Sequence, residues 1–532
     1  MNMNSNERGS IRTLFLIIVG IIILYITVFS KDSRYLSEFS QLLPGRIYEV
    51  TKASENLPIS RDPSETITIS EVTKLRKMLQ EEKFEQLNII LGKYQSIFEK
   101  DQSDEYKVYD AYGAFYVTVP SYEDFFKKWI DITPDKYQPY LAITQYYYAK
   151  AWESRGYKWS KDTSKKQFKS MRFFFEKAKS NLDIALLLNP NLMVAYNTLI
   201  GIYNATGDNG SENEFISITA ELFPYSFIMR STCSWVKQPR WGGSYILMED
   251  IARDAEQYSD KNPKLPVLYG FIYYDQAKIF ERDDKYEKAL EMLDKALAFG
   301  DDWSFYNERA RIYLYDLKQY DQALREINRS IELRPVRTEH YLTRSRIYFA
   351  QGNYKESLAD VHMAETITPG TADARTVRKW ASATLLKRGH TAYRTDLRNA
   401  IKEYDLSLTF DDNNADTYYW RGMARGRLKE YDAAEADFKT AIRINPRHFD
   451  SYRMLDYVLA RKRRWDTIIS YWDAFLKLEP THADAYYERA GTYYHKKDMK
   501  HMMCDLKKAC EFGNENACKR YQTAVNGNKP KG

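Results

Sequence analysis

Apolar residues recur at helical spacing along most of the chain after residue 70. The first clear example is SEVTKLRKMLQEEKFEQLNIILGKYQSIFEKD, where apolar side chains return every three or four residues on two successive segments. These positions are Leu75, Leu79, Phe84, Leu87, Leu91 and Tyr94. The pattern predicts a pair of amphipathic helices, and weaker versions of it continue to about residue 260.

Prolines mark a repeat in the second half of the chain. Pro335 and Pro369 are 34 residues apart, and so are Pro446 and Pro480. The interval between Pro369 and Pro446 fits the same period if Asp412 holds a proline position and nine residues are inserted before it. We expect the insertion near Lys387–His390, in the turn of that repeat.

The residues between the prolines resemble the tetratricopeptide repeat, a 34-residue helix–turn–helix. In YYWRGMARGRLKEYDAAEADFKTAIRINP the aromatic, small and proline positions follow the family's order. They are Tyr418, Gly422, Tyr431, Ala434, Phe438, Ala441 and Pro446. The segment FYNERARIYLYDLKQYDQALREINRSIELRP fits with one extra residue in its turn. The resemblance implies an all-α solenoid superhelix over residues 261–525, ending in a capping helix.

The N-terminal half resembles a second family, bacterial proteins in which a divergent helical domain of unknown function precedes tetratricopeptide repeats. The resemblance is carried by EEKFEQLNIILGKYQ, YYYAKAWESRGYKW, KAKSNLDIALLLNPNLMVAYNTLIGIY and PRWGGSYILMEDIARDA. We assign residues 70–260 to this domain, and the family implies no activity for it.

A membrane segment is predicted near the N-terminus. Thr13–Phe29 holds 17 residues without a charge or a proline, which is at the short end of a membrane-spanning helix. We expect a tail over residues 1–12, a transmembrane helix over 13–29, a linker over 30–69 and a flexible tail over 526–532. A signal peptide cleaved after Ser30 is the alternative. An anchor would place the protein in the bacterial inner membrane with its C-terminal domain in the periplasm.

Composition narrows the chemistry. The net charge is only +6, so no nucleic-acid partner is expected. None of the seven histidines belongs to a convincing ligand set, although His495, His501 and Cys504 lie close in sequence, and we predict neither a metal nor a cofactor. The sequence PRWGGS could hold an anion at a helix N-terminus, but no strand precedes it. We favour Ser244 as the N-cap of a helix that begins near Tyr245.

The last two cysteines, Cys510 and Cys518, flank a glycine-containing turn. They resemble the cysteines of Sel1-like repeats, which pair across a helix–turn–helix. The resemblance implies a disulfide that holds a terminal helix over residues 515–525, and a disulfide implies an oxidising compartment. Two reduced, packed cysteines are the alternative.

Tetratricopeptide repeats bind partners on a concave groove lined by the first helix of each repeat. Carried over to this chain, the groove residues are Tyr419, Met423, Arg427, Arg453, Tyr457, Arg461, Tyr487 and Tyr494. The basic run Arg461–Arg464 is interpreted mainly as a solvated helix end. We predict a membrane-anchored, non-enzymatic scaffold whose groove holds a protein or peptide. The alternative is an envelope enzyme, or a glycan- or lipid-binding protein, with its site in the N-terminal helical half.

Overall fold

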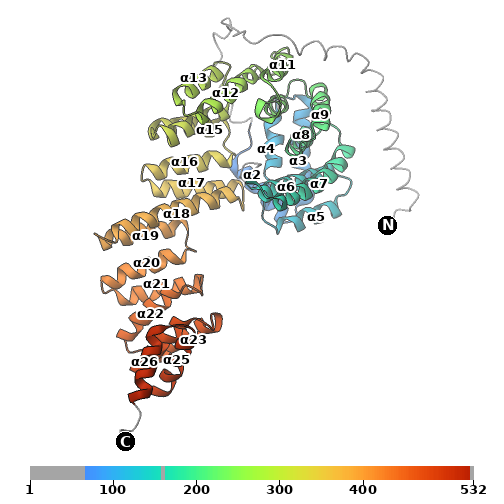
Figure 1. Ribbon diagram of the computed structural model, residues 1–532. Coiled ribbons are helices and arrows are strands. Elements are labelled where there is room, and N and C mark those ends of the chain that lie inside the picture. Colours follow the sequence, from blue (N-terminus) through green and yellow to red (C-terminus); the bar gives the residue numbers. More distant parts are fainter. Residues whose placement is uncertain (1–65, 157–161, 528–532) are drawn as a thin grey trace, which may run out of the picture. The chain divides into compact units, whose positions relative to one another are not determined.

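The computed structural model describes residues 66–156 and 162–527, all within a compact unit that spans residues 58–532 (Figure 1). Helices and turns account for this part of the chain, and it contains no strand. No helix in the described ranges is long and apolar enough to cross a membrane. The predicted transmembrane segment 13–29 lies outside those ranges, and so does nearly all of the linker 30–69.

The N-terminal part is a helical domain that begins at a capping box. The Thr68 side chain accepts a hydrogen bond from the Glu71 amide, and the Glu71 carboxylate accepts one from the Thr68 amide. Two backbone N–H groups that the helix leaves unpaired are thereby satisfied. The first two helices match the pair expected from the apolar pattern. The helices are α2 (Ile69–Gln80), α3 (Phe84–Lys100), α4 (Glu105–Gly113), α5 (Tyr122–Ile132), α6 (Tyr137–Arg155), α7 (Lys165–Leu188), α8 (Met193–Thr206), α9 (Asn209–Leu222), α10 (Phe227–Val236) and α11 (Tyr245–Glu256).

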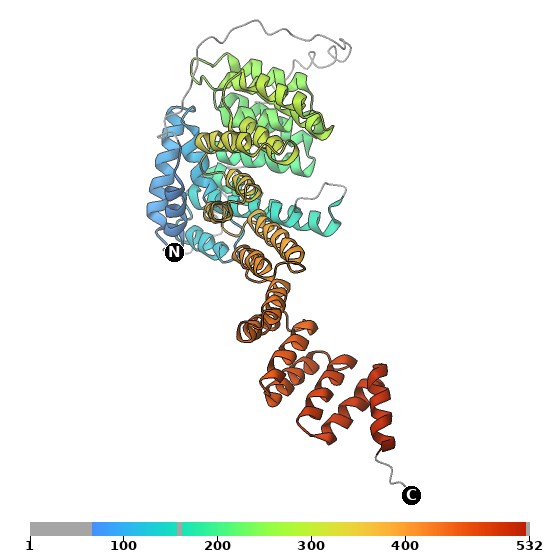
Figure 2. The same cartoon turned by 90° about the vertical axis from the view of Figure 1, so that its left-hand side faces the viewer.

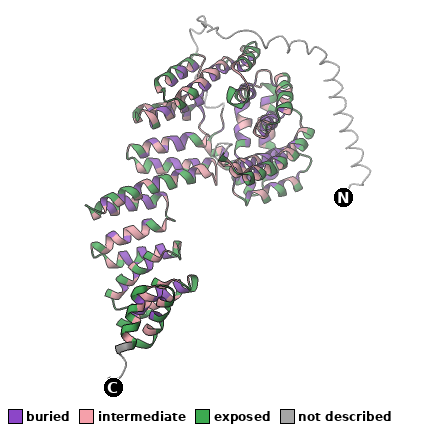
Figure 3. Cartoon of the chain, viewed as in Figure 1, coloured by how far each residue is buried: buried purple, intermediate pink, exposed green. Residues whose placement is uncertain are grey.

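The C-terminal part is a stack of helical hairpins that follow one another in sequence order (Figure 1). The helices are α12 (Gly270–Arg282), α13 (Tyr286–Leu297), α14 (Trp303–Arg311), α15 (Tyr320–Leu333), α16 (Thr338–Ala350), α17 (Tyr354–Ile367), α18 (Ala372–Ala392), α19 (Leu397–Phe410), α20 (Ala415–Arg427), α21 (Tyr431–Ile444), α22 (Phe449–Arg461), α23 (Trp465–Leu478), α24 (Ala483–His495), α25 (Met499–Glu511) and α26 (Glu515–Gly527). Buried residues line the inner sides of these hairpins (Figure 3). The predicted all-α solenoid is therefore confirmed.

A tyrosine and an arginine recur in the first helix of several hairpins. The tyrosine hydroxyl donates to the carbonyl of the proline that ended the preceding hairpin, which satisfies an acceptor where a helix stops. These pairs are Tyr341–Pro335 (3.0 Å), Tyr452–Pro446 (3.2 Å) and Tyr486–Pro480 (3.2 Å). The arginine, three residues after such a tyrosine position, pairs with an aspartate in the second helix. These pairs are Arg344–Asp360 (2.8 Å), Arg421–Asp437 (2.6 Å) and Arg489–Asp505 (2.7 Å).

Both predicted insertions lie within helices rather than in turns. The extra residue after α14 is accommodated by a π-helical turn, Ile312–Asp316, because a π-turn holds one more residue than an α-turn. Lys387–His390 likewise belong to α18, which extends over 21 residues. Gly389 permits the extended helix to pack closely on α19, since a Cβ there would lie 2.3 Å from the Tyr404 ring. The predicted turn positions of these residues are wrong.

The N-terminal domain packs against the middle of the stack (Figures 1 and 2). The Arg76 guanidinium of α2 donates to the carbonyl of Ile367 at 2.9 Å and to that of Ala114 at 3.3 Å, and burial lowers its pKa to about 10. Arg334, at the end of α15, pairs with Asp110 of α4 at 2.5 Å, and both side chains are 4% exposed. A buried ion pair and a buried hydrogen bond to a backbone carbonyl therefore join segments more than 200 residues apart in the chain.

Candidate partner-binding face

The first helices α20, α22 and α24 present side chains from one side of the stack. Arg453, Tyr457 and Arg461 are spaced by four residues on α22, so they lie in a row along one helix face. All three are exposed, and the Tyr457 side chain is 48% exposed. Arg427 of α20 and Tyr494 of α24 are also exposed, Tyr494 by 57%. Five of the eight residues predicted for the groove are thus open to solvent.

The other three predicted groove residues are half-buried. The Tyr419 ring packs 6.1 Å from Phe438 and 5.2 Å from His448, centroid to centroid, and so belongs partly to the core between hairpins. Met423 also packs against this core. The Tyr487 ring lies 5.2 Å below the Arg520 guanidinium of α26. These residues pack against the core behind the face and contribute only part of its surface.

Arginines on the face are held in place by aromatic rings. The Arg461 guanidinium stands 4.8 Å from the Tyr457 ring and 5.2 Å from the Tyr431 ring, and it donates to the Tyr457 hydroxyl. Arg427 stands 5.0 Å over the Tyr393 ring and donates to the Tyr393 carbonyl at 3.2 Å. Cation–π stacking restricts the arginine rotamers, so less side-chain entropy remains to be lost when a partner binds.

A carboxylate beneath this face was not expected from the sequence. Asp456 precedes Tyr457 and accepts a 2.8 Å hydrogen bond from the buried Trp472 indole N–H. Burial raises the pKa of Asp456 to about 6, even though this hydrogen bond favours the charged form. The sequence does contain a signal for this carboxylate. At the repeat position of Asp456, the neighbouring repeats carry the small residues Gly422 and Ala490.

Two residues of the basic run Arg461–Arg464 are paired with carboxylates within the protein. Lys462 pairs with Asp432 at 2.5 Å and with Glu435 at 2.7 Å, and Arg464 pairs with Glu435 at 2.9 Å. Burial alone would raise the pKa of Glu435, but hydrogen bonds from Lys439 and Lys462 outweigh it and hold the pKa at about 2. Lys462 and Arg464 therefore link consecutive hairpins.

Comparison with known proteins identifies the repeated unit. Family patterns described as "Tetratricopeptide repeat" match residues 312–371 and 415–448. The chain carries tetratricopeptide repeats. A third pattern, "Domain of unknown function (DUF4034)", matches residues 71–210 within the N-terminal domain. Both predicted resemblances are confirmed, while the boundaries at residues 70, 260 and 525 stay predictions.

Similar curated proteins have low sequence identity to this chain. The TPR repeat-containing protein MJ1428 of Methanocaldococcus jannaschii is 23% identical over 258 residues, which cover 43% of this chain and 44% of that protein. The mitochondrial import receptor subunit TOM70 of Homo sapiens is 25% identical over 201 residues, covering 36% of this chain and 31% of that protein. The chain thus spans less than half the length of these curated relatives.

Similar solved structures include MamA and yeast Tom70. MamA is 22% identical, covering 32% of this chain and 96% of its own with a TM-score of 0.24. Yeast Tom70 is 13% identical, covering 86% of this chain and 94% of its own, also with a TM-score of 0.24.

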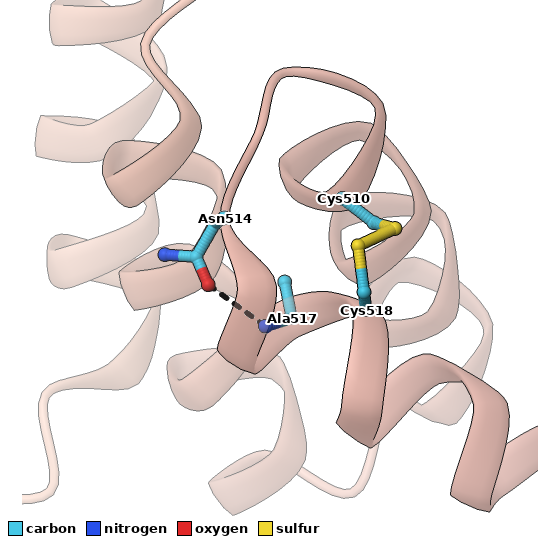
Figure 4. Close-up of a disulfide and its surroundings, with 4 residues drawn as sticks. All are labelled: Cys510, Asn514, Ala517 and Cys518. Atoms are coloured by element: carbon cyan, nitrogen blue, oxygen red, sulfur yellow. Dashed lines mark hydrogen bonds between the residues drawn. A yellow bond between two sulfur atoms is a disulfide. The ribbon is translucent and has the colours of Figure 1, made fainter.

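The tetratricopeptide stack ends at a disulfide between Cys510 of α25 and Cys518 of α26 (Figure 4). Their Cα atoms lie 4.6 Å apart. In the turn between them, the Asn514 side-chain oxygen accepts a 2.7 Å hydrogen bond from the Ala517 amide and so caps α26. The bridge and the cap together hold the last helix against its neighbour. The similarity to Sel1-like repeats stays a prediction.

The PRWGGS segment and the histidine pair have local structural roles. Ser244 accepts a 3.2 Å hydrogen bond from the Leu247 amide as the N-cap of α11, which begins at Tyr245 as predicted. His501 contacts Asp498 at 2.7 Å, and His495 stacks on the Trp465 ring. Residues 66–156 and 162–527 contain no group of three or more histidine, cysteine or carboxylate side chains placed to hold a metal ion.

Proposed function

We propose that the protein is a non-enzymatic scaffold that binds protein partners on the face formed by α20, α22 and α24. The observation that carries this proposal is the exposure of Tyr457 and Tyr494 beside the exposed arginines Arg427, Arg453 and Arg461. Tyrosine and arginine are enriched at binding hot spots because each combines a large contact area with hydrogen-bonding groups.

The rigidity of the face supports the same proposal. Its exposed side chains come from helices packed into a stack, and stacking or ion pairing orients several of them. Arg453, for example, bridges α22 to α24 by contacting Glu488 at 3.2 Å. A preorganised surface loses less conformational entropy on binding than a mobile one does, which favours affinity.

Photo-crosslinking from the face tests the proposal. A photoreactive amino acid would replace Tyr457 in the full-length protein in its native cells, and crosslinked proteins would be identified by mass spectrometry. The matched control places the same group at Ser470, an exposed position on α23 of the same repeat. We expect specific partners from position 457 only, and fewer of them when Arg427→Ala and Arg453→Ala are added. Identical products from both positions would refute the proposed face.

We further propose that the scaffold is anchored in a bacterial inner membrane and that its repeats lie in the periplasm. The 17 uncharged residues Thr13–Phe29 support the anchor, and a Cys510–Cys518 bridge is suited to an oxidising compartment. A C-terminal alkaline phosphatase fusion should be active, whereas a cytosolic fluorescent fusion should be dark. An inactive phosphatase fusion with a fluorescent cytosolic fusion would overturn the periplasmic placement of the repeats. Release of the protein from membranes by alkaline carbonate would overturn the anchor.

A further inference from the structure

One position in the hairpin turns takes a left-handed backbone conformation. In three consecutive repeats it is occupied by Lys429 (φ 68°), Arg463 (φ 55°) and Lys497 (φ 64°), each 34 residues from the next. Gly352 takes the corresponding conformation in an earlier repeat, with φ 82°. This region is unfavourable for residues with a Cβ and is usually occupied by glycine. The three repeats thus place a cation where backbone geometry favours glycine.

The residues just before two of these positions are already paired. Lys462 contacts Asp432 at 2.5 Å, and Lys496 contacts Asp466. Each lysine thereby neutralises a carboxylate at the start of the second helix in the preceding repeat. Among the described residues, these carboxylates pair with the lysines and not with the neighbouring left-handed residues.

The left-handed residues themselves have no ionic partner in the part of the chain that the structure describes. Lys429, Arg463 and Lys497 are exposed, and their side chains form no ion pair or hydrogen bond with any residue that the structure describes. The carboxylates that follow two of them are engaged elsewhere, Glu430 with Arg398 at 3.9 Å and Asp498 with His501 at 2.7 Å. The result is a row of three unpaired cations, here called the turn ridge.

The turn ridge adjoins the proposed binding face. Arg427 and Arg461 end helices α20 and α22, two residues before Lys429 and Arg463. A partner that contacts the exposed arginines therefore reaches the ridge at the edge of the stack. The ridge extends the positive charge of the face without extending its apolar surface.

We propose that the turn ridge binds an acidic polypeptide segment of the partner held on the face. This inference rests on the proposed function and assigns the charge of the partner. A row with one cation per repeat suits a linear ligand whose carboxylates are spaced along its length. Complementary charge at the rim of an interface mainly raises the association rate and excludes partners of the wrong sign. Salt should weaken the contact, since exposed charges are screened beyond about 8 Å at physiological ionic strength.

Glycine substitutions separate charge from folding. The variant K429G/R463G/K497G removes all three cations and leaves a residue suited to the left-handed backbone, so we expect an unchanged or higher melting temperature. The matched control is Asp284→Gly, at a left-handed turn (φ 57°) outside the ridge. The probe is a fluorescent glutamate–tyrosine copolymer peptide, and its glutamine–tyrosine counterpart reports charge-independent binding.

We expect the full-length protein to bind the glutamate peptide about tenfold more tightly than the triple variant, with a weaker salt dependence in that variant. Asp284→Gly should bind as the wild type does. Equal affinity of wild type and triple variant would overturn the proposal. The proposal would also be overturned if the triple variant lost binding to phosphatidylserine vesicles but bound the peptide as the wild type does. That result would assign the ridge to lipid headgroups. Persistent crosslinking from position 457 in either case would leave the binding face intact and refute only the ridge.

Discussion

The Arg334–Asp110 pair should control whether the N-terminal domain stays docked on the repeats. Both side chains are 4% exposed, and the Arg334 guanidinium also lies 4.5 Å from the Tyr106 ring. Asp110→Asn keeps the shape of the side chain but removes its charge. Arg334→Met keeps much of the length but removes the cation. Either change leaves one buried charge without its ionic partner.

The loss of stability in each variant follows from the desolvation of the charge that remains buried. Removing one member of a buried ion pair costs about 3–5 kcal/mol, because the remaining charge is left in a low-dielectric site. We expect each single variant to lose about that much stability at the docking interface. The double variant should lose less than the sum, since it leaves no uncompensated charge, and the difference measures the coupling between the two side chains.

Hydrogen exchange is the suitable assay because a chain with several packed parts does not unfold in one step. Amides of α2–α4 should exchange faster in both single variants, while those of α22–α25 should keep their wild-type rates. Asp360→Asn is the matched control, because it breaks the Arg344–Asp360 pair within one hairpin. Costs below about 1 kcal/mol, or equal effects on α2–α4 from the control, would refute the reasoning.

Three further changes test local features. Burial lowers the pKa of His340 from 6.5 to about 4, so as the pH falls the unfolded chain is protonated before the folded protein. The free energy of unfolding should therefore be highest above pH 6.5 and decrease by about 3 kcal/mol towards pH 4. Denaturation of the His340→Phe variant should not show this fall, and an unchanged profile would contradict the assignment. Gly389→Ala places a Cβ 2.3 Å from a tyrosine ring and should lower the free energy of unfolding, measured by thermal denaturation, by about 1–3 kcal/mol. The control Gly426→Ala meets open space and should be nearly neutral. Equal effects of the two substitutions would contradict the steric argument. Replacing Cys510 and Cys518 by serine should cost about 2–3 kcal/mol, and a reductant should destabilise the wild type but not this variant; a wild type insensitive to reductant would show that the bridge contributes little.

Local signals in the sequence predicted local structure well. Apolar spacing located α2 and α3, and Ser244 with its two preceding glycines located the start of α11. The proline period located the later hairpins. Each of these signals acts within a few residues or one repeat, because helix capping and amphipathic packing depend on near neighbours.

Features that depend on distant or irregular packing were not predictable in this way. Arg334 and Asp110 are 224 residues apart, and no periodic pattern links them. The extra residue after α14 could have extended a turn or widened a helix, and the repeat pattern does not distinguish the two; the structure has a π-turn there. Of the predicted face residues, Tyr419 turned partly inward because Phe438 and His448 offer it an aromatic contact.

The middle and the C-terminal end of the repeat stack are stabilised by different contacts, and this bears on where a partner can bind. In a solenoid each repeat is held by its neighbours, so the terminal repeats fray most easily unless they are capped. The N-terminal domain covers one part of the stack through Arg76 and Arg334, while the Cys510–Cys518 bridge fixes the last helix. Among the described residues, α20–α24 pack extensively only against helices one or two positions away. Their exposed side is therefore held by neighbouring helices and left uncovered by the other residues that the structure describes, which is the combination that a partner-binding face requires.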